Sequence, residues 1–423
     1  MTEHGNTPIP RYRQLHWQVL AAMVLGAAAG FLGGETAAGW VGWLGTLFMR
    51  LLRMVIIPLV VVSIVSGIAT VGGGRALGRL FGKTLGYYVL SSALAIFAGL
   101  VLVNLIRPGE GADLGAAEGQ ALPELETPGS PVELLLDIVP QNFLAAAAGG
   151  DMLAVIFFSI LLGVAVAGLR SPHQEVLSGF FGAAFEVMMA LTGGIIRFLP
   201  LGVFGLMTAA VAEFGLDAFG PLAKYCATIA AGLTVHLLVT LPLLLLLLGR
   251  IRPGIHFRNM IDPLVVAFST SSSGATLPVT MRTVQRKVGV SNRTASFVLP
   301  MGATINMDGT ALFECVGVLF IAQALGADLA FGQQAIVVLT ALLASIGAAA
   351  VPSAGLVIIF IVLESVGLRG PHVDLIVGFM LAIDRPLDMF RTTVNVFSDS
   401  CGAAIIARSE GETGVDAASE TSG

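Results

Sequence analysis

Long apolar runs separated by short basic or polar segments make up most of this chain. About 20 apolar residues cross the hydrocarbon core of a bilayer as a helix, and each of the early runs reaches or approaches that length. In chain order the expected helical runs are residues 17–33, 41–71, 84–106, 131–169, 174–213 and 219–249. The fourth run contains Pro140 and Gly149, so we expect a broken helix there.

Basic residues follow alternate runs, which is how cytoplasmic loops differ from external ones. One such loop is expected to carry Arg75, Arg79 and Lys83. We therefore predict that the N-terminal segment, residues 1–15, and the C-terminus both lie in the cytoplasm. The tail, residues 409–423, is polar and acidic and is expected to be disordered.

Two later segments are apolar but interrupted by small and polar residues. The first, about residues 258–290, has basic flanks at both ends and a Ser/Gly break at 269–274, so it should enter and leave on the same side. The second, about residues 331–368, has the same form and acidic flanks, with its break at 347–355. We predict two re-entrant helical hairpins of opposite orientation, which is typical of inverted-repeat transporters.

The final apolar run carries a polar stripe. Asp384, Asp388, Arg391, Asn395 and Asp399 follow one another at spacings of four, three, four and four residues, which places them on one side of a helix. An ionisable side chain inside a membrane is unfavourable by roughly 2.5–3.5 kcal/mol even on lenient scales. The stripe should therefore face protein, water or ligand, and its excess of carboxylates favours a cation partner.

Composition agrees with a membrane protein. The chain is 56% hydrophobic and only 12% charged, with a mean hydropathy of +0.89, whereas a soluble domain is roughly 25% charged. The fold class is therefore an all-α polytopic membrane protein, with eight transmembrane helices plus the two hairpins. We expect membrane lipid around it and no nucleic-acid partner. An enzyme is not expected, because the serine cluster at 271–273 has no convincing Lys or His partner and no GxSxG motif.

The discontinuities and the polar stripe supply a specific chemistry. Free backbone N–H groups at helix breaks suit a carboxylate, and free carbonyls suit a hard cation such as sodium. Asn306 and Asp308 offer oxygen ligands beside a helix break. The forked donors of Arg391 match a carboxylate, and Asp388 can accept an ammonium group. Aspartate or glutamate would satisfy all of these groups.

Other interpretations of the same residues stay open. Asp388 and Arg391 could form only a structural ion pair, and Asp308 could be only a hydrogen-bond acceptor that stabilises the bundle. His236 is interpreted as a lone packed histidine. A symporter of C4-dicarboxylates such as succinate or malate would keep Arg391 but would have no need for Asp388.

Four motifs in order resemble those of the dicarboxylate/amino acid:cation symporter family, the glutamate transporter homologues. They are SSSGATLP at 271–278, GATINMDGTAL at 302–312, ASIGAAAVPSAG at 344–355 and DRPLDMFRTTVNVFSDS at 384–400. The resemblance implies uptake of L-aspartate or L-glutamate coupled to sodium, in a homotrimer that works by an elevator motion. It also implies a scaffold domain, residues 16–72 and 131–215, and a transport domain, residues 84–107 and 219–408.

The same resemblance implies the site residues. Substrate would be bound by Ser271, Ser273, Thr310, Val351, Pro352, Gly355, Asp388, Arg391, Thr392 and Asn395. Sodium would be bound by Tyr88, Ser91, Ser92, Gly302, Thr304, Asn306, Asp308, Ser345, Ile346, Ala348, Asn395 and Asp399. Glu314 resembles the proton-carrying glutamate of some relatives, which leaves proton co-transport and potassium counter-transport as open alternatives.

Overall fold

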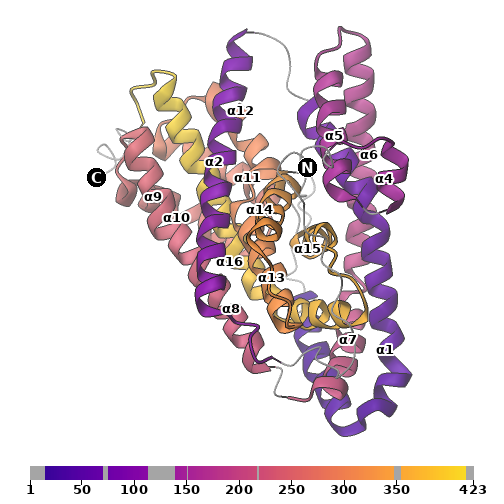
Figure 1. The fold of residues 1–423 in the computed structure, drawn as a ribbon. Coiled ribbons are helices and arrows are strands. Elements are labelled where there is room, and N and C mark those ends of the chain that lie inside the picture. The colour runs from indigo at the N-terminus through magenta and orange to yellow at the C-terminus, as the bar shows by residue number, and fades with distance from the viewer. Residues whose placement is uncertain are drawn as a thin grey trace, which may run out of the picture.

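The computed structural model describes residues 15–69, 75–112, 139–149, 151–216, 219–346 and 354–415, and within these residues the chain forms helices and no strand. The first helices are α1 (Leu15–Ala69), α2 (Arg75–Ile106), α4 (Phe143–Gly149), α5 (Met152–Ala167), α6 (His173–Ile196), α7 (Leu199–Phe214) and α8 (Phe219–Val235) (Figure 1). The π-helical segments η2 (His236–Thr240) and η3 (Leu245–Gly249) flank α9 (Leu241–Leu244). The later helices are α10 (Pro253–Thr270), α11 (Ser273–Thr283) with η4 (Val284–Val288), α12 (Asn292–Ile305), α13 (Asp308–Ala324), α14 (Phe331–Ile346), α15 (Ala354–Ser365) and α16 (Pro371–Ser409).

The helix α1 contains the first two expected runs. It is broken at Gly34, whose φ of 50° and ψ of −141° are not helical. Glycine reaches this conformation without the steric penalty that a side chain would impose. The two halves of α1 correspond to the runs predicted at 17–33 and 41–71.

Three predicted boundaries were wrong. The third run begins at Arg75 rather than at residue 84, so Arg79 and Lys83 lie in helix α2 and not in a loop. The run predicted at 174–213 is two helices, because Pro200 in the first turn of α7 cannot sit in a helix interior without losing a backbone hydrogen bond. The first interrupted segment begins at Pro253 rather than at 258.

The predicted breaks lie where the composition placed them. Asp151 caps α5, its Oδ1 accepting the N–H of Ala154 at 3.2 Å, after α4 has ended. Helix α10 ends at Thr270. The next residue, Ser271, has a φ of 51°, and α11 starts at Ser273. Asn306 and Met307 separate α12 from α13, at the helix break that the sequence predicts beside Asn306 and Asp308. The break between α14 and α15 lies outside the described residues.

The helices pack in two groups. In the first group, α1 packs mainly on α7, with α5 and α6 beside it. In the second group, α2 and α8 pack on α13, and α10 to α13 gather round α16. The two groups lie side by side in Figure 1, and α7 and α16 form the most extensive packing between them.

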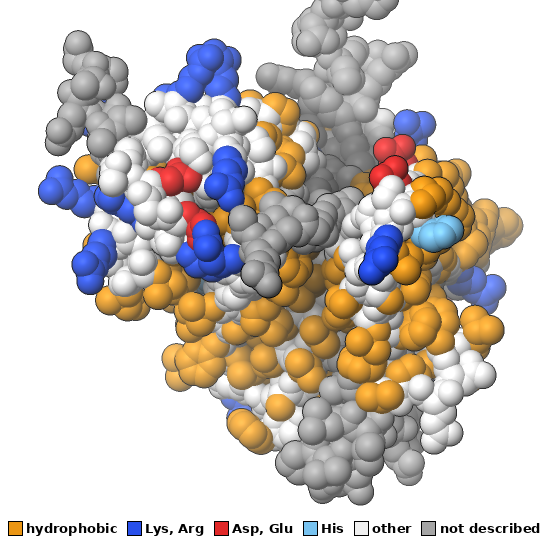
Figure 2. All heavy atoms as spheres, turned by 90° about the horizontal axis from the view of Figure 1, so that it is seen from above, with side chains coloured by type: hydrophobic (Ala, Val, Ile, Leu, Met, Phe, Trp, Pro, Cys, Tyr) orange, Lys and Arg blue, Asp and Glu red, His pale blue; other side chains and the backbone are white. Residues whose placement is uncertain are grey.

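The outer surface is suited to a bilayer. Within the described part of the chain, five helical stretches are long and apolar enough to cross a membrane, namely Trp17–Ala69, Gly78–Ile106, His173–Ile196, Phe219–Gly249 and Asn292–Ala324. Large apolar side chains such as Leu25, Phe31 and Phe180 are more than half exposed. Figure 2 shows one end of the molecule, where Lys and Arg side chains gather above a band of exposed apolar ones.

The start of the acidic tail is not disordered, which corrects the prediction for residues 409–423 as far as 415. Glu410 forms ion pairs with Arg79 at 2.7 Å and Lys83 at 2.6 Å. Glu412 accepts hydrogen bonds from the hydroxyls of Ser291 and Thr294, each at 2.6 Å. These bonds fix the end of α16 to the starts of α2 and α12. Residues 416–423 lie outside the described part of the chain.

Candidate functional site

Asp308 is the centre of a fully buried polar cluster. It starts α13 directly after the helix break, and its side chain has no exposed surface. Its Oδ1 accepts hydrogen bonds from the hydroxyls of Ser92 at 2.6 Å and Ser91 at 3.2 Å, both on α2. Its Oδ2 accepts one from the Ser398 hydroxyl of α16 at 2.6 Å. Three helices that are far apart in sequence therefore meet at one carboxylate.

His236 also belongs to this cluster, so its interpretation as a lone packed histidine was wrong. Its Nε2 lies 3.0 Å from Asp308 Oδ2, and both side chains are completely buried. Neither His236 nor Ser398 was among the predicted site residues. The signal for His236 was a polar side chain within a long apolar run, and that for Ser398 was its place beside Asp399 on the polar stripe.

Asn306 and Asp399 extend the cluster, which we call the Asp308 cluster throughout. The Asn306 amide donates to Asp399 Oδ1 at 2.9 Å and to the Ser398 hydroxyl at 3.0 Å. Gly302 lies so close that a Cβ there would be 2.5 Å from Asp399 Oδ1 and 2.6 Å from the Tyr88 hydroxyl. The backbone of α12 at Gly302 therefore lies directly against the carboxylate of Asp399. Most of the predicted sodium ligands are brought together here.

The remaining predicted sodium ligands are not joined in this way. Thr304 donates to the carbonyl of Met301 at 3.1 Å, and Ser345 to that of Leu342 at 2.8 Å, each within its own helix. No hydrogen bond between described residues connects the two side chains. Ile346 ends α14, and Ala348 lies outside the described residues.

Arg391 is the centre of a second buried cluster on α16, which we call the Arg391 cluster. Its guanidinium donates to Asp388 Oδ1 at 2.7 Å and lies 3.5 Å from Asp384 Oδ1. The Phe313 ring covers one face, with its centroid 4.3 Å from the Arg391 Cζ. A Cβ at Gly355 would lie 3.0 Å from Arg391 Nη1. Arg391 and Asp388 are thus held in the protein interior, one helical turn apart, as their spacing predicted.

Asn395 connects the two clusters. Its side-chain Oδ1 accepts the backbone N–H of Gly309 at 2.8 Å, and its amide lies 3.5 Å from the Thr310 hydroxyl. A Cβ at Gly309 would lie 2.9 Å from the Arg391 Cγ and backbone oxygen. The helix break that places Asp308 in one cluster thereby also places Thr310 next to the other.

Other predicted substrate residues are buried without direct bonds to Arg391. Ser271, Ser273 and Thr392 have 1%, 6% and 5% of their surface exposed, and the Ser271 hydroxyl has no hydrogen-bond partner among the described residues. Glu314 is fully buried, and neither of its carboxyl oxygens has such a partner. The Arg391 guanidinium is close enough for its charge to act on this carboxyl group. Val351 and Pro352 lie outside the described residues.

Comparison with known families agrees with this geometry. The sodium:dicarboxylate symporter family matches residues 15–409, nearly the whole chain. This chain belongs to that family. It is therefore a multi-pass membrane transporter and not an enzyme.

Named relatives align over most of their length. The proton/sodium-glutamate symport protein of Bacillus caldotenax is 35% identical over 94% of this chain and 95% of its own. The proton/glutamate-aspartate symporter of Escherichia coli (strain K12) is 34% identical over 94% of this chain and 93% of its own. An excitatory amino acid transporter of Caenorhabditis elegans is 35% identical over 81% of this chain and 76% of its own.

The Asp308 cluster fits the sodium ion that the family name implies. Its donors are carboxylate, amide and hydroxyl oxygens, and hard cations prefer oxygen ligands. Ser91, Ser92 and Ser398 can each turn the hydroxyl hydrogen elsewhere and present a lone pair, because a hydroxyl is both donor and acceptor. The buried carboxylates of Asp308 and Asp399 would supply the compensating negative charge.

Proposed function

We propose that this transporter is a secondary active symporter that takes up L-aspartate and L-glutamate together with sodium. The observation that supports it best is the buried Asp388 and Arg391 pair, 2.7 Å apart on one helix face. Arg391 would bind the side-chain carboxylate of the substrate through its forked donors. Asp388 would bind the ammonium group. The named glutamate and aspartate relatives support the same substrates.

The pair alone would also fit a purely structural role, so its surroundings matter. Among the described residues, only two carboxylate oxygens are within 3.5 Å of the guanidinium, which carries five N–H donors. The Asp384 Oδ2, the Ser271 hydroxyl and the Tyr225 hydroxyl have no partner among the described residues. Unpaired buried polar atoms are unfavourable by roughly 1–3 kcal/mol each, and a polar ligand that pairs them would recover this free energy.

The coupling ions of the proposal are sodium and a proton. Sodium would be held by three sets of residues. They are Tyr88, Ser91, Ser92, Asn306 and Asp308; Gly302, Asn306, Asn395 and Asp399; and Thr304, Ser345, Ile346 and Ala348. The proton would be carried by Glu314, which is buried within range of the Arg391 charge and has no hydrogen-bond partner among the described residues.

The two packing groups are the proposed moving parts. The group of α1, α5, α6 and α7 corresponds to the scaffold, and the group around α13 and α16 corresponds to the transport domain, which contains both proposed clusters. Alternating access would be an elevator movement of the second group along the first, within a homotrimer in the inner membrane, with both termini cytoplasmic. Packing is concentrated within the groups, which supports this division.

A competition assay tests the proposed substrate. Uptake of radiolabelled L-aspartate is measured in proteoliposomes with an inward sodium gradient, against unlabelled L-glutamate and succinate. We expect strong inhibition by L-glutamate and little by succinate. Strong inhibition by succinate would favour the C4-dicarboxylate alternative, because succinate has no ammonium group for Asp388.

The Asp388→Ala variant separates the two substrates further. A dicarboxylate symporter would retain succinate uptake in this variant, because only Arg391 is then required. An amino-acid symporter would lose uptake of L-aspartate and gain none of succinate.

A further inference from the structure

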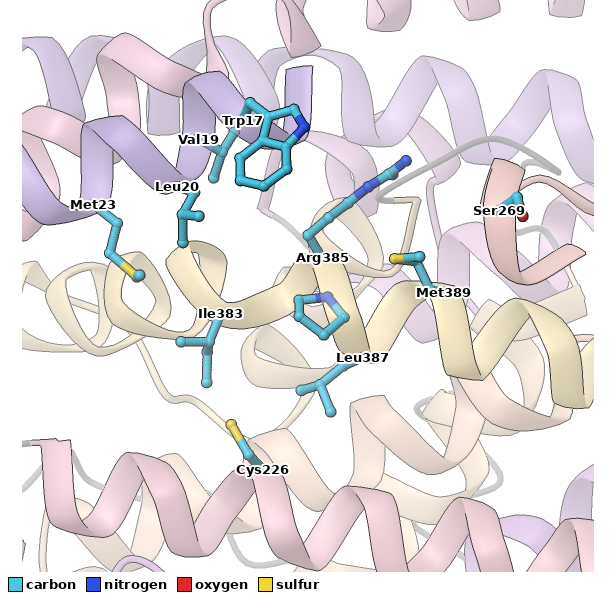
Figure 3. A pocket seen from close by; sticks show the side chains of 11 residues that line it. Trp17, Val19, Leu20, Met23, Cys226, Ser269, Ile383, Arg385, Leu387 and Met389 are labelled. Atoms are coloured by element: carbon cyan, nitrogen blue, oxygen red, sulfur yellow. The ribbon is translucent and has the colours of Figure 1, made fainter. Parts of the chain in front are cut away.

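A pocket of about 480 Å³ lies where the two helix groups meet, outside the Asp308 cluster and next to the Arg391 cluster, because its lining residue Arg385 is 3.6 Å from Asp388. Its volume is within the roughly 300–1,000 Å³ range of small-molecule sites. Figure 3 shows Trp17, Leu20 and Met23 of α1 on one side and Leu387 of α16 on the other, with Cys226 of α8 beyond. No residue that we assigned to substrate, sodium or proton lines the pocket.

The lining is almost entirely apolar. Trp17 and Leu20 are each 44% exposed on α1, a helix that is apolar and long enough to cross a bilayer. Exposed side chains of such a helix face the acyl chains of the surrounding lipid. A hydrocarbon chain is therefore the occupant that matches the walls.

One charged side chain, Arg385, also lines this pocket. Its Nη1 forms an ion pair with Asp388 Oδ2 at 3.6 Å, which is longer than a hydrogen bond, while Asp388 Oδ1 binds Arg391 at 2.7 Å. No hydrogen bond connects the Arg385 side chain to another described residue, and 24% of that side chain is exposed. A guanidinium with unused forked donors matches a phosphate group.

Trp17 gives a second reason for an amphiphile. Tryptophan is enriched where the hydrocarbon region meets the head groups, because its ring is apolar and its N–H is polar. Trp17 and Arg385 line the same pocket. Trp17 suits the head-group region, Arg385 suits a phosphate, and the walls beside them are apolar. We infer that the pocket binds an anionic phospholipid of the surrounding bilayer. Its phosphate pairs with Arg385, and one acyl chain lies against Leu20, Met23 and Leu387.

Such a lipid would touch both helix groups. Trp17 and Leu20 belong to the group of α1, and Arg385 and Leu387 to the group of α16. The lipid therefore bridges the boundary at which the proposed movement would occur. The binding itself goes beyond the proposed transport function and is measured without transport.

Tryptophan fluorescence provides the test. Trp40 and Trp43, which are 77% and 59% exposed, are replaced by Phe, so that Trp17 is the remaining tryptophan. The protein is placed in phosphatidylcholine vesicles that contain increasing fractions of brominated phosphatidylglycerol or brominated phosphatidylcholine. Bromine on the acyl chain quenches a nearby tryptophan. We expect half-maximal quenching at a fraction of phosphatidylglycerol about fivefold lower than that of phosphatidylcholine. One basic residue near an anionic lipid surface gives a preference of this size.

Matched proteins locate the effect. A protein that keeps only Trp40 should show no preference between the two lipids, because Trp40 does not line the pocket. In the Trp17 protein, Arg385→Gln should remove the preference, and Arg385→Lys should retain part of it. Leu20→Phe should reduce quenching by filling the pocket. Leu25→Phe, at a 61% exposed position of the same helix outside the pocket, should not.

Three results would overturn the proposal. Equal quenching of Trp17 by both lipids would remove the anionic preference, and a preference that survives Arg385→Gln would remove the role of Arg385. Stronger quenching by a brominated fatty acid, at equal fraction, would assign the pocket to a free carboxylate in place of a phospholipid. If Arg385→Gln does not fold, equal quenching in Leu20→Phe and Leu25→Phe would contradict the claim that the lipid binds in this pocket.

Discussion

The two buried clusters that meet at α16 differ in how far their carboxylate groups are satisfied. In the Asp308 cluster, the two carboxylate oxygens of Asp308 together have four partners, from Ser91, Ser92, Ser398 and His236. In the Arg391 cluster, Asp384 Oδ2 and both oxygens of Glu314 have no partner among the described residues. The hydroxyl of Tyr225, which is close enough to Asp384 and Arg391 to interact with their charges, also has none.

This difference shows what each cluster can do. The carboxylate of Asp308 is already held in position by hydroxyl and imidazole groups of the cluster. A cation could therefore bind between the oxygens once the hydroxyl hydrogens turn away, without large movement of the oxygens themselves. The Arg391 cluster has unused hydrogen-bonding capacity for a larger polar molecule. The comparison predicts that substitutions in the first cluster change sodium dependence. Substitutions in the second should change the substrate and proton requirements.

Asp308→Asn should have the largest effect on sodium. The substitution replaces a buried carboxylate with an amide, whose N–H₂ group would face the hydroxyl and imidazole donors and could not accept their hydrogen bonds. Each lost hydrogen bond to a charged group is unfavourable by roughly 1.5–3 kcal/mol. We expect the sodium concentration that gives half-maximal L-aspartate uptake to rise by about 10- to 100-fold. The matched control is Asp262→Asn, since Asp262 forms an exposed ion pair with Lys287 at 2.7 Å. An unchanged sodium requirement in Asp308→Asn would separate this cluster from coupling.

His236→Leu should have a similar but smaller effect. It removes one of the four partners of Asp308 and leaves the others in place, whereas His236→Gln retains an N–H donor. Half-saturation by sodium should rise severalfold, up to about tenfold, in the Leu variant and recover in the Gln variant.

A second buried histidine provides the control for general destabilisation. His256 lies 2.9 Å from the Ser400 hydroxyl and does not touch Asp308. His256→Leu should lower thermal stability and leave the sodium requirement unchanged. If His236→Leu behaves in the same way as His256→Leu, then His236 does not position the carboxylate of Asp308.

Glu314→Gln should change pH dependence rather than sodium dependence. The amide keeps the shape of the side chain but cannot carry a proton. We expect uptake by the variant to vary less with external pH than uptake by the wild type, at the same sodium requirement. The control is Glu364→Gln, a partly buried glutamate on α15. A pH profile identical to that of the wild type would exclude Glu314 as the proton carrier.

The smallest effect is expected outside both clusters, at Glu410. Its hydrogen bonds to Arg79 and Lys83 lower the pKa of Glu410 from 4.5 to about 2. A lowered folded-state pKa contributes stability that is complete above 4.5 and is lost as pH falls toward 2. Glu410→Gln should therefore lower the melting temperature slightly at neutral pH, because surface ion pairs contribute little.

Melting curves of the detergent-solubilised protein at several pH values test this effect. The difference between the wild type and Glu410→Gln should shrink as the pH falls below 4.5. A constant difference across this range would mean that the ion pairs are not its cause.

The parts of the fold that depend on local chemistry could be predicted from the sequence. The runs of apolar residues located the helices, and small or polar interruptions located the breaks at Ser271 and at Asn306. The spacing of Asp388, Arg391 and Asn395 placed them on one helix face, as the structure has them. Each of these features depends on neighbouring residues alone.

The parts that depend on tertiary contacts could not be predicted. His236 and Asp308 are 72 residues apart, and no local pattern pairs them. The split between α6 and α7 was missed because the apolar run continues through Pro200 without a change in composition. Glu410 and Glu412 looked like members of a disordered acidic tail. Their partners are on α2 and at the start of α12, too far away in sequence for composition to reveal.

The most direct test of the central claim is uptake of radiolabelled L-aspartate into proteoliposomes, with and without an inward sodium gradient. Wild type is compared with Arg391→Ala and with Arg258→Ala, an exposed arginine on α10. We predict sodium-driven uptake in wild type and Arg258→Ala and none in Arg391→Ala. Sodium-driven uptake that survives in Arg391→Ala would contradict the assignment of the carboxylate site. Uptake by wild type that is indifferent to sodium would contradict the coupling.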